Sequence, residues 1–257
     1  MVCKSLDNPR DRDALQAAIK SVISTKQYGY EDLLSGLVTD AAMTTMTPTG
    51  RARFIPDSLR IAKIRGGSVN QWTYLKGMGV ARGAEGVVKA VKNAKVVVFG
   101  CGIETAATEA KGTVLLKNAD DLLNYNKSEE KAMEEVISGI AQTGAKLVIS
   151  HGAVSEMALH YLDKYGIMCV KIMSKFDLRR ICGAMGATAI IRLAPPTPEE
   201  MGEISSVEVV EVAGRKVIKF VQEQNEDTTT ATIIVRASTE NVANDVERAL
   251  DDGIHSV

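Results

Sequence analysis

The sequence has 257 residues, of which 45% are hydrophobic and 25% are charged, the composition of a globular protein that can bury one or two cores. Its net charge of −1 and its aromatic content of 4% argue against a nucleic-acid-binding surface. No apolar run approaches the roughly 20 residues of a membrane span, and the first residues lack the apolar core of a signal peptide.

The first quarter of the chain predicts two helices followed by a strand. Residues 14–26 and 30–46 have helical patterns, and residues 47–58 form a loop that contains two prolines. Residues 60–66 predict a strand. After Gly66 and Gly67 the sequence changes from long helical patterns to short strand-like runs, and we place a domain boundary there.

The middle of the chain predicts an α/β arrangement. Residues 94–100 and 112–117 read as short strands on either side of an exposed excursion, and Ser128 is a candidate cap for a helix that ends at Gly144. An alternation of strands and helices follows, with a Ser174 cap and Asp177 in a capping-box position. Its strands are 146–150, 167–173 and 188–193, and its helices are 153–166 and 175–186. This order predicts a small parallel sheet with right-handed crossovers.

The last part of the chain predicts a hairpin, a strand and a helix. Residues 206–212 and 216–222 form the hairpin, residues 232–238 form the strand, and Thr239 caps the helix. A polar connecting segment at 222–230 separates this end from the middle, and we place a domain boundary near Asn225. We therefore expect a discontinuous domain made of both chain ends, with an α/β domain inserted between them.

The final helix carries Asp251 and Asp252 close to its end, where the helix dipole disfavours negative charge. Its apolar positions are Val242, Val246, Ala249, Leu250, Gly253 and Val257. Because this pattern reaches the last residue, two interpretations stay open: a solvated, frayed helix, or a helix that continues in a longer protein. A carboxylate on its polar side could also orient a water or a metal-bound phosphate.

Candidate catalytic motifs are weak. Residues 100–105 contain G-x-G after a strand, but Thr105 stands where a dinucleotide fingerprint needs a third glycine. His151, His160 and His255 lack metal-ligand spacing, and no phosphate-binding P-loop is present. The cysteines Cys3, Cys101, Cys169 and Cys182 contain no C-x-x-C pair, so reduced thiols in a cytoplasmic protein are expected.

The helix at 153–165 has two unlike faces. Val154, Met157, Ala158, Tyr161, Leu162 and Tyr165 are expected to be buried. Leu159 is expected on the opposite face, together with Ser155, Glu156, His160 and Asp163. Such a mixed face either is simply solvated or holds many unfolded segments weakly.

Five segments resemble the group II chaperonins, and the resemblance covers nearly the whole chain. They are STKQYGYEDLL, ATEAKGTVLLKNADDLLNYNKSEE, MALHYLDKYGIM, KFDLRRICGAMGATAIIRLAPPTPEEMG and RASTENVANDVERALDDG. The resemblance implies an intermediate domain formed by residues 1–66 and 225–257, and an apical substrate-binding domain at 67–224. It also implies that an equatorial domain, which binds ATP and Mg, lies outside this sequence, so that the last helix continues and this chain alone holds no cofactor and is not an enzyme.

Site residues follow from the resemblance position by position. Asp252 matches the aspartate that helps to activate the attacking water during ATP hydrolysis. The substrate groove matches the helix Ala153–Tyr165 and the loop Ala81–Val88. Its lining residues are Ser155, Glu156, Leu159, His160, Asp163, Ala81, Arg82 and Glu85. Residues 103–130 match the helical protrusion that forms the lid, with Leu122, Leu123 and Tyr125 on it.

Three classes of function are weighed. The resemblance implies a chaperonin part that binds unfolded polypeptide, sits in a hetero-oligomeric double ring with other subunits, and closes a built-in lid. Alone, the chain is expected to be monomeric and to bind neither nucleic acid, metal nor membrane. One alternative is a lid and ring-contact scaffold without substrate binding. The other is a self-contained enzyme, against which the sequence shows no nucleophile, metal-binding or phosphate-binding constellation.

Overall fold

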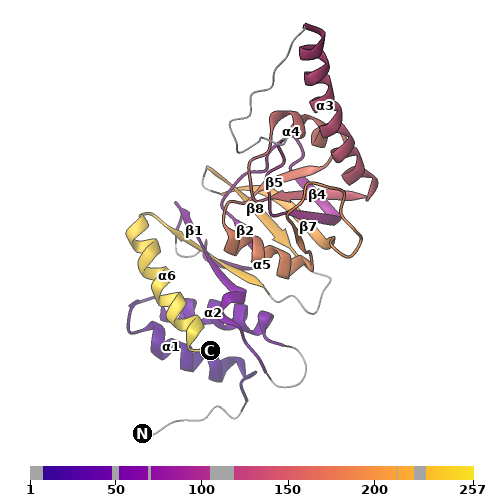
Figure 1. Ribbon diagram of the computed structural model, residues 1–257. Coiled ribbons are helices and arrows are strands. Elements are labelled where there is room, and N and C mark those ends of the chain that lie inside the picture. The colour runs from indigo at the N-terminus through magenta and orange to yellow at the C-terminus, as the bar shows by residue number, and fades with distance from the viewer. Residues whose placement is uncertain (1–7, 48–51, 69–70, 105–118, 213, 223–229) are drawn as a thin grey trace. The chain divides into compact units, whose positions relative to one another are not determined.

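A computed structural model of the chain describes residues 8–47, 52–68, 71–104, 119–212, 214–222 and 230–257 (Figure 1). The chain divides into two compact units. The first unit is residues 1–82 with 209–257, and the second is residues 83–208. The predicted strand at 112–117 lies outside the described residues.

The first unit is formed by both ends of the chain. Its elements are α1 (Arg12–Ile23), α2 (Glu31–Thr45), the 3-10 helix η1 (Pro56–Ser58), β1 (Leu59–Arg65), β2 (Thr73–Val80), β8 (Arg215–Val221), β9 (Ala231–Ala237) and α6 (Glu240–His255). The strand order is β1-β9-β2-β8, with β9 parallel to β1 and antiparallel to β2. The predicted helices, the β1 strand and the Thr239 cap are confirmed, since the Thr239 hydroxyl accepts from the Val242 N–H.

The core of the first unit lies where three helices meet β9. Ile19 and Ile23 of α1, Val38 of α2, and Val246 and Leu250 of α6 are almost fully buried there. Figure 1 shows α6 alongside α1 and α2. The apolar stripe predicted for α6 is therefore largely confirmed. Val242 is the exception.

Val242 was predicted to lie on the buried stripe, but its side chain is 44% exposed. It occupies the first turn of α6, immediately after the residues that link the helix to β9. Burial in this helix starts one residue later, at Ala243, and the core cluster includes residues of α6 only from Val246 onward.

Gly253 of α6 is placed where a side chain would be crowded. A Cβ atom there would lie 3.2 Å from both Cδ1 and Cγ1 of Ile23, and 3.4 Å from Ile19 Cγ2. Alanine normally stabilises a helix interior by about 1 kcal/mol over glycine. We expect Gly253→Ala to gain less than half of that, because Ile23 has to shift. Urea unfolding of both forms measures the difference, and the full gain would show that α1 yields freely.

The second unit is an α/β sheet. Its elements are β3 (Ala90–Phe99), α3 (Ala119–Gln142), β4 (Ala145–Ser150), α4 (Glu156–Lys164), β5 (Met168–Lys171), α5 (Lys175–Met185), β6 (Ala189–Ile190) and β7 (Gly202–Val212), of which residues 202–208 belong here. β3, β4 and β5 are parallel neighbours, and β6 is parallel to β3. The predicted parallel sheet is confirmed, although β6 has only two residues and pairs with β3.

Helices α3 and α4 cover one face of this sheet. Phe99, Ile137, Val148 and Leu162 belong to one buried cluster that joins the sheet to both helices. Strand residues of the alternate parity, such as Leu147 and Ile149, are equally buried but lie outside this cluster, on the opposite face. The Ser174 cap of α5 is confirmed, because its hydroxyl accepts from the Asp177 N–H.

Two sequence-based expectations about this region differ from the structure. Ser128 does not cap α3, because the helix already begins at Ala119. A serine within a helix costs only about 0.5 kcal/mol, so a candidate cap does not force a helix to begin. The compact units divide at residues 82 and 209, whereas the sequence predicted boundaries near Gly67 and Asn225. The first boundary lies further along the chain because β2 pairs with β9, which keeps β2 in the first unit.

Candidate functional site

Helix α4 is held at its start by two hydrogen bonds. The Ser155 hydroxyl accepts from the Ala158 N–H at 3.2 Å, and the Ser155 N–H donates to the Ile103 carbonyl at 3.0 Å. Ala158, Tyr161 and Leu162 then turn toward the sheet and are buried. The helix spans residues 156–164, which is shorter than the predicted 153–165, and Ser155 acts as its cap.

The outer face of α4 carries Glu156 and His160, both exposed as predicted. Two residues differ from the prediction: Met157 is 37% exposed, and Leu159 is half-buried and packs against the core cluster. Both lie about 100° from the centre of the buried stripe, one on each flank, at 100° per residue. The helical period therefore cannot tell which flank the rest of the fold covers.

The loop that was predicted to border the groove is docked onto β5 and α4. The Glu85 N–H donates to the Cys169 carbonyl at 2.9 Å, and the Val87 N–H donates to Asp163 Oδ1 at 2.9 Å. Gly86 has a φ of +82°, and a Cβ atom there would lie 2.6 Å from Asp163 Oδ1. Asp163 therefore anchors the loop, and the Val87 side chain is left 76% exposed beside α4.

The structure brings only part of the predicted lining set together. Glu85 and Asp163 meet through the loop contacts, and Glu156 and His160 share the outer face of α4. Ala81 and Arg82 belong to the first unit, where the Arg82 N–H donates to the Val80 carbonyl at 2.8 Å. Leu122, Leu123 and Tyr125 lie on α3, and their side chains are outside the described residues.

Sequence patterns did not indicate the polar pairs that join α4 to α3. The Tyr161 hydroxyl donates to Glu130 Oε1 at 3.1 Å, and Lys164 Nζ lies 3.0 Å from Glu134 Oε1. Burial and then the Glu130 carboxylate raise the pKa of Tyr161, and the hydrogen bond to Glu134 raises the pKa of Lys164. The i,i+4 spacing of the two glutamates indicated that they share one face of a helix. Their partners on α4 could be identified only from the tertiary structure.

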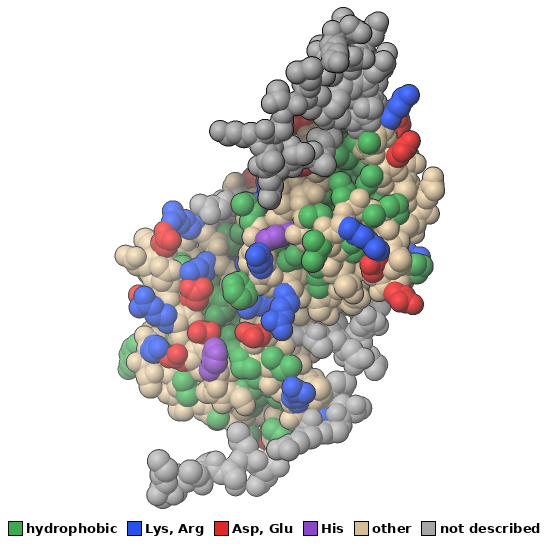
Figure 2. Space-filling model, viewed as in Figure 1, with side chains coloured by type: hydrophobic (Ala, Val, Ile, Leu, Met, Phe, Trp, Pro, Cys, Tyr) green, Lys and Arg blue, Asp and Glu red, His purple; other side chains and the backbone are tan. Residues whose placement is uncertain are grey.

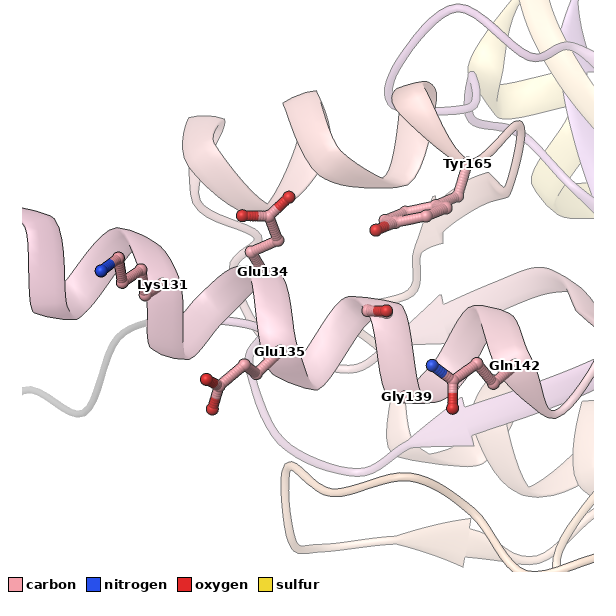
Figure 3. Close-up of a pocket in the computed structure, with 7 residues that line it drawn as sticks. Lys131, Glu134, Glu135, Gly139, Gln142 and Tyr165 are labelled. Carbon is pink, nitrogen blue, oxygen red and sulfur yellow. The ribbon is translucent and has the colours of Figure 1, made fainter.

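An open pocket lies along α3 and reaches the end of α4 (Figure 3). Its volume is about 390 Å³. Its lining residues are Lys131, Glu134, Glu135, Ser138, Gly139, Gln142 and Tyr165. In Figure 3 the Tyr165 ring extends from the end of α4 toward α3. Most of its lining residues carry charged or polar side chains.

Cys169 is buried beneath the docked loop. Burial raises the pKa of its thiol to about 12, and the nearby Glu85 and Asp163 carboxylates add to the effect. Such a thiol is protonated at neutral pH and does not act as a nucleophile. Among the described residues, no group of three His, Cys, Asp or Glu side chains could hold a metal ion.

Asp252 lies in the first unit on the side of α6 away from its buried stripe. Its half-exposed carboxylate forms an ion pair with Nζ of Lys26, which follows α1. The neighbouring Asp251 carboxylate lies 3.6 Å from His255 Nδ1. Sequence reasoning identified Asp252 but not Lys26, because the two are far apart in the chain.

None of the described helices combines the length and the apolar character that crossing a bilayer requires.

Comparison with known proteins gives consistent matches over the whole chain. Residues 1–257 match the sequence profile of the TCP-1/cpn60 chaperonin family. T-complex protein 1 subunit theta of Saccharomyces cerevisiae is 44% identical over 264 residues, covering 100% of this chain and 46% of the yeast protein. The Homo sapiens subunit theta is 43% identical over 256 residues, with coverage of 100% and 46%. The chain thus spans about half the length of the curated relatives it matches.

A solved structure has a similar fold. It is the open-state monomer of a group II chaperonin from Methanococcoides burtonii, with a TM-score of 0.78 and 25% sequence identity. The match covers 99% of this chain and 57% of the archaeal one.

Proposed function

The chain belongs to the TCP-1/cpn60 chaperonin family, and we propose that it is the part of a chaperonin subunit that binds unfolded polypeptide between α4 and the loop at 83–88. The family resemblance inferred from the sequence is confirmed, and the yeast and human relatives are both theta subunits. Two observations carry the binding proposal: the loop anchored at Asp163 leaves Val87 exposed, and the outer face of α4 leaves Met157 and His160 exposed.

This surface suits weak and selective binding. Val87 and Met157 supply modest apolar area, while Glu156 and His160 keep the rest polar. Several such sites on neighbouring subunits would raise the overall affinity by avidity. We also propose that the subunit belongs to a hetero-oligomeric ring in the cytoplasm and that the isolated chain is a monomer.

The described residues do not fit ATP and Mg on their own. Asp252 is a single carboxylate paired with Lys26, and the described part of the chain offers no cluster of metal ligands. We therefore assign no hydrolysis step to this chain. In the longer proteins of the family, Asp252 is proposed to face the nucleotide site of another domain.

A second candidate is a lid and ring-contact scaffold without substrate binding. It is favoured by the charged character of the outer face of α4, where Glu156, His160 and Lys164 are all exposed. The two functions differ in whether the isolated chain binds an unfolded polypeptide.

The test is a titration of the chain with a labelled, chemically unfolded polypeptide, with the same polypeptide folded as a control. We expect binding to the unfolded form alone. Changing Met157 and His160 together to Glu should weaken it by about tenfold, because binding energy concentrates in a few contact residues. Leu159 is avoided because it packs against the core.

The matched control is Lys146→Glu, which changes the charge by a similar amount at an exposed position of β4 outside this surface. Equal weakening by the control would indicate a general charge effect. Absence of binding to the unfolded form would favour the scaffold.

A further inference from the structure

The open pocket along α3 shares no residue with the proposed groove, and the proposed function does not use it. Six of its seven lining residues come from α3, between Lys131 and Gln142, and the seventh is Tyr165 at the end of α4. At 1.5 Å of rise per residue, the lining on α3 is about 16 Å long. A volume of about 390 Å³ along a lining of this length suits a linear small ligand.

One end of the pocket lies at the negative pole of α3. The last turn of this helix contains no basic residue, so none of its own side chains offsets the helix dipole there. The Thr143 N–H donates to the Ile140 carbonyl at 3.2 Å, which leaves the Gly139 carbonyl without its usual donor four residues further on. Gly139 and Gln142 line the pocket at this end. The helix dipole and the oxygen acceptors therefore favour a cation there.

Carboxylates lie on the earlier turns of the same lining. Glu134 Oε1 already pairs with Lys164 Nζ at 3.0 Å, whereas Glu135 is exposed and forms no ion pair within the described part of the chain. Figure 2 shows acidic and basic side chains next to one another over the region where Figure 1 places α3. Glu135 and Gln142 are seven residues apart, about 10 Å along the helix axis. The pocket thus has two positions that favour positive charge, separated by about 10 Å.

The Tyr165 ring supplies an apolar surface between these two positions. It is half-buried and packs against the core cluster, which fixes its place. In Figure 3 the ring stands opposite the stretch of α3 between Glu134 and Gln142. An aromatic ring contacts an alkyl chain favourably, and its face attracts a nearby cation.

We propose that this pocket binds a linear diamine or polyamine along α3. One ammonium group pairs with Glu135, a second lies at the last turn of the helix near Gln142, and the alkyl chain between them contacts Tyr165. Linking the two cations makes the second contact intramolecular, which strengthens binding. A metal ion or a single lysine side chain of another protein brings one cation and fills one position only. Lys131 repels the ligand and limits its affinity.

The probes are the terminal diamines diaminobutane and diaminooctane, titrated against the chain by isothermal titration calorimetry at constant ionic strength. Octanediol, which has the same alkyl chain without charge, is the neutral control. We expect diaminooctane to bind about fivefold more tightly than diaminobutane, because only the longer diamine reaches both positions. Its affinity should fall as salt is raised, and octanediol should not bind. Amide resonances of residues 131–142 should shift on binding.

Charge changes at the two positions test how the ligand lies. Glu135→Gln and Gln142→Lys should each weaken diaminooctane binding by about threefold, whereas Lys131→Gln should strengthen it by a similar factor. All three side chains are exposed, so the fold should tolerate the changes. The matched control is Glu203→Gln, which removes a carboxylate at an exposed position of β7 outside the pocket and should leave binding unchanged.

Four results would overturn the proposal. They are equal affinity for the two diamines, binding of octanediol as tight as that of diaminooctane, wild-type binding by the Glu135 and Gln142 variants, and tighter binding of a peptide with two lysines than of diaminooctane. The last result would assign the pocket to a segment of another protein. Because the probe is a small amine, none of these results bears on the titration with unfolded polypeptide.

Discussion

Replacing Gly77 with alanine is expected to destabilise the first unit by about 3 kcal/mol or more. Gly77 has a φ of +115°, and a Cβ atom there would lie 2.0 Å from the backbone oxygen of Phe220. No side-chain movement relieves a clash with backbone, so either β8 must move away or Gly77 must change its conformation.

The position of Gly77 explains why both a displacement of β8 and a change in the backbone conformation of Gly77 are costly. Residues 73–76 of β2 pair with β9, and residues 77–80 pair with β8, so β2 changes partner at this glycine. The Gly77 N–H donates to the Thr230 carbonyl at 3.0 Å, and its own carbonyl accepts from the Thr232 hydroxyl at 2.9 Å. A shift at Gly77 therefore breaks these two hydrogen bonds on the β9 side and disturbs the pairing of Gly77 with Val221 of β8.

The measurement is urea unfolding of the variant against the wild type, with Gly29→Ala as the matched control. Gly29 lies in the same unit with a φ of +93°, but nothing stands within 4 Å of its Cβ position. Its substitution should cost only the backbone strain, about 1 kcal/mol. Equal losses for the two variants would mean that β8 accommodates the methyl group, and the change of partner at Gly77 would not need glycine.

Local signals in the sequence were sufficient for most of the elements. The Ser174 and Thr239 caps, the glycine that ends α3 and the alternating strands of the parallel sheet depend on neighbouring residues only. The start of α3 was misplaced because Ser128 has the chemistry of a cap but lies within a longer helical stretch. A cap signal says where a helix can begin and does not exclude a start further upstream.

The candidate site was less predictable because its contacts join distant segments. Asp163 was placed on the outer face of α4, but its role in anchoring Val87 needs the loop to be docked beside it. The same is true of Lys26 beside Asp252, since neither position carries a pattern that points to the other. Periodicity gives the direction of a side chain, whereas the partner comes from the tertiary fold.

Raising the pH above 9 is expected to destabilise the second unit through Cys169. Its thiol has a pKa of about 12 in the folded protein, against an ordinary value of 9.0, because it is buried and lies near Glu85 and Asp163. The unfolded chain therefore releases this proton first. The stabilising contribution is complete below pH 9 and is lost at about 1.4 kcal/mol per pH unit as the pH rises toward 12.

The measurement is urea unfolding at pH 8 and at pH 11, where the Cys169 contribution alone predicts a loss of about 2–3 kcal/mol. Lysines and tyrosines also titrate in this range, so the informative quantity is the difference from Cys169→Ala. That variant is less stable at every pH because of its cavity, but its free energy of unfolding should fall less steeply between the two pH values.

Asp163→Asn tests the electrostatic part of the same effect. Asparagine keeps an oxygen that can accept from the Val87 N–H, so the loop stays anchored while the negative charge near the thiol is removed. The Cys169 pKa should then fall part of the way toward 9, and the loss of stability between pH 8 and pH 11 should become smaller. If Cys169→Ala and Asp163→Asn both show the pH dependence of the wild type, water reaches the thiol. The loop at 83–88 would then not cover β5 as the contacts of Glu85 and Val87 require.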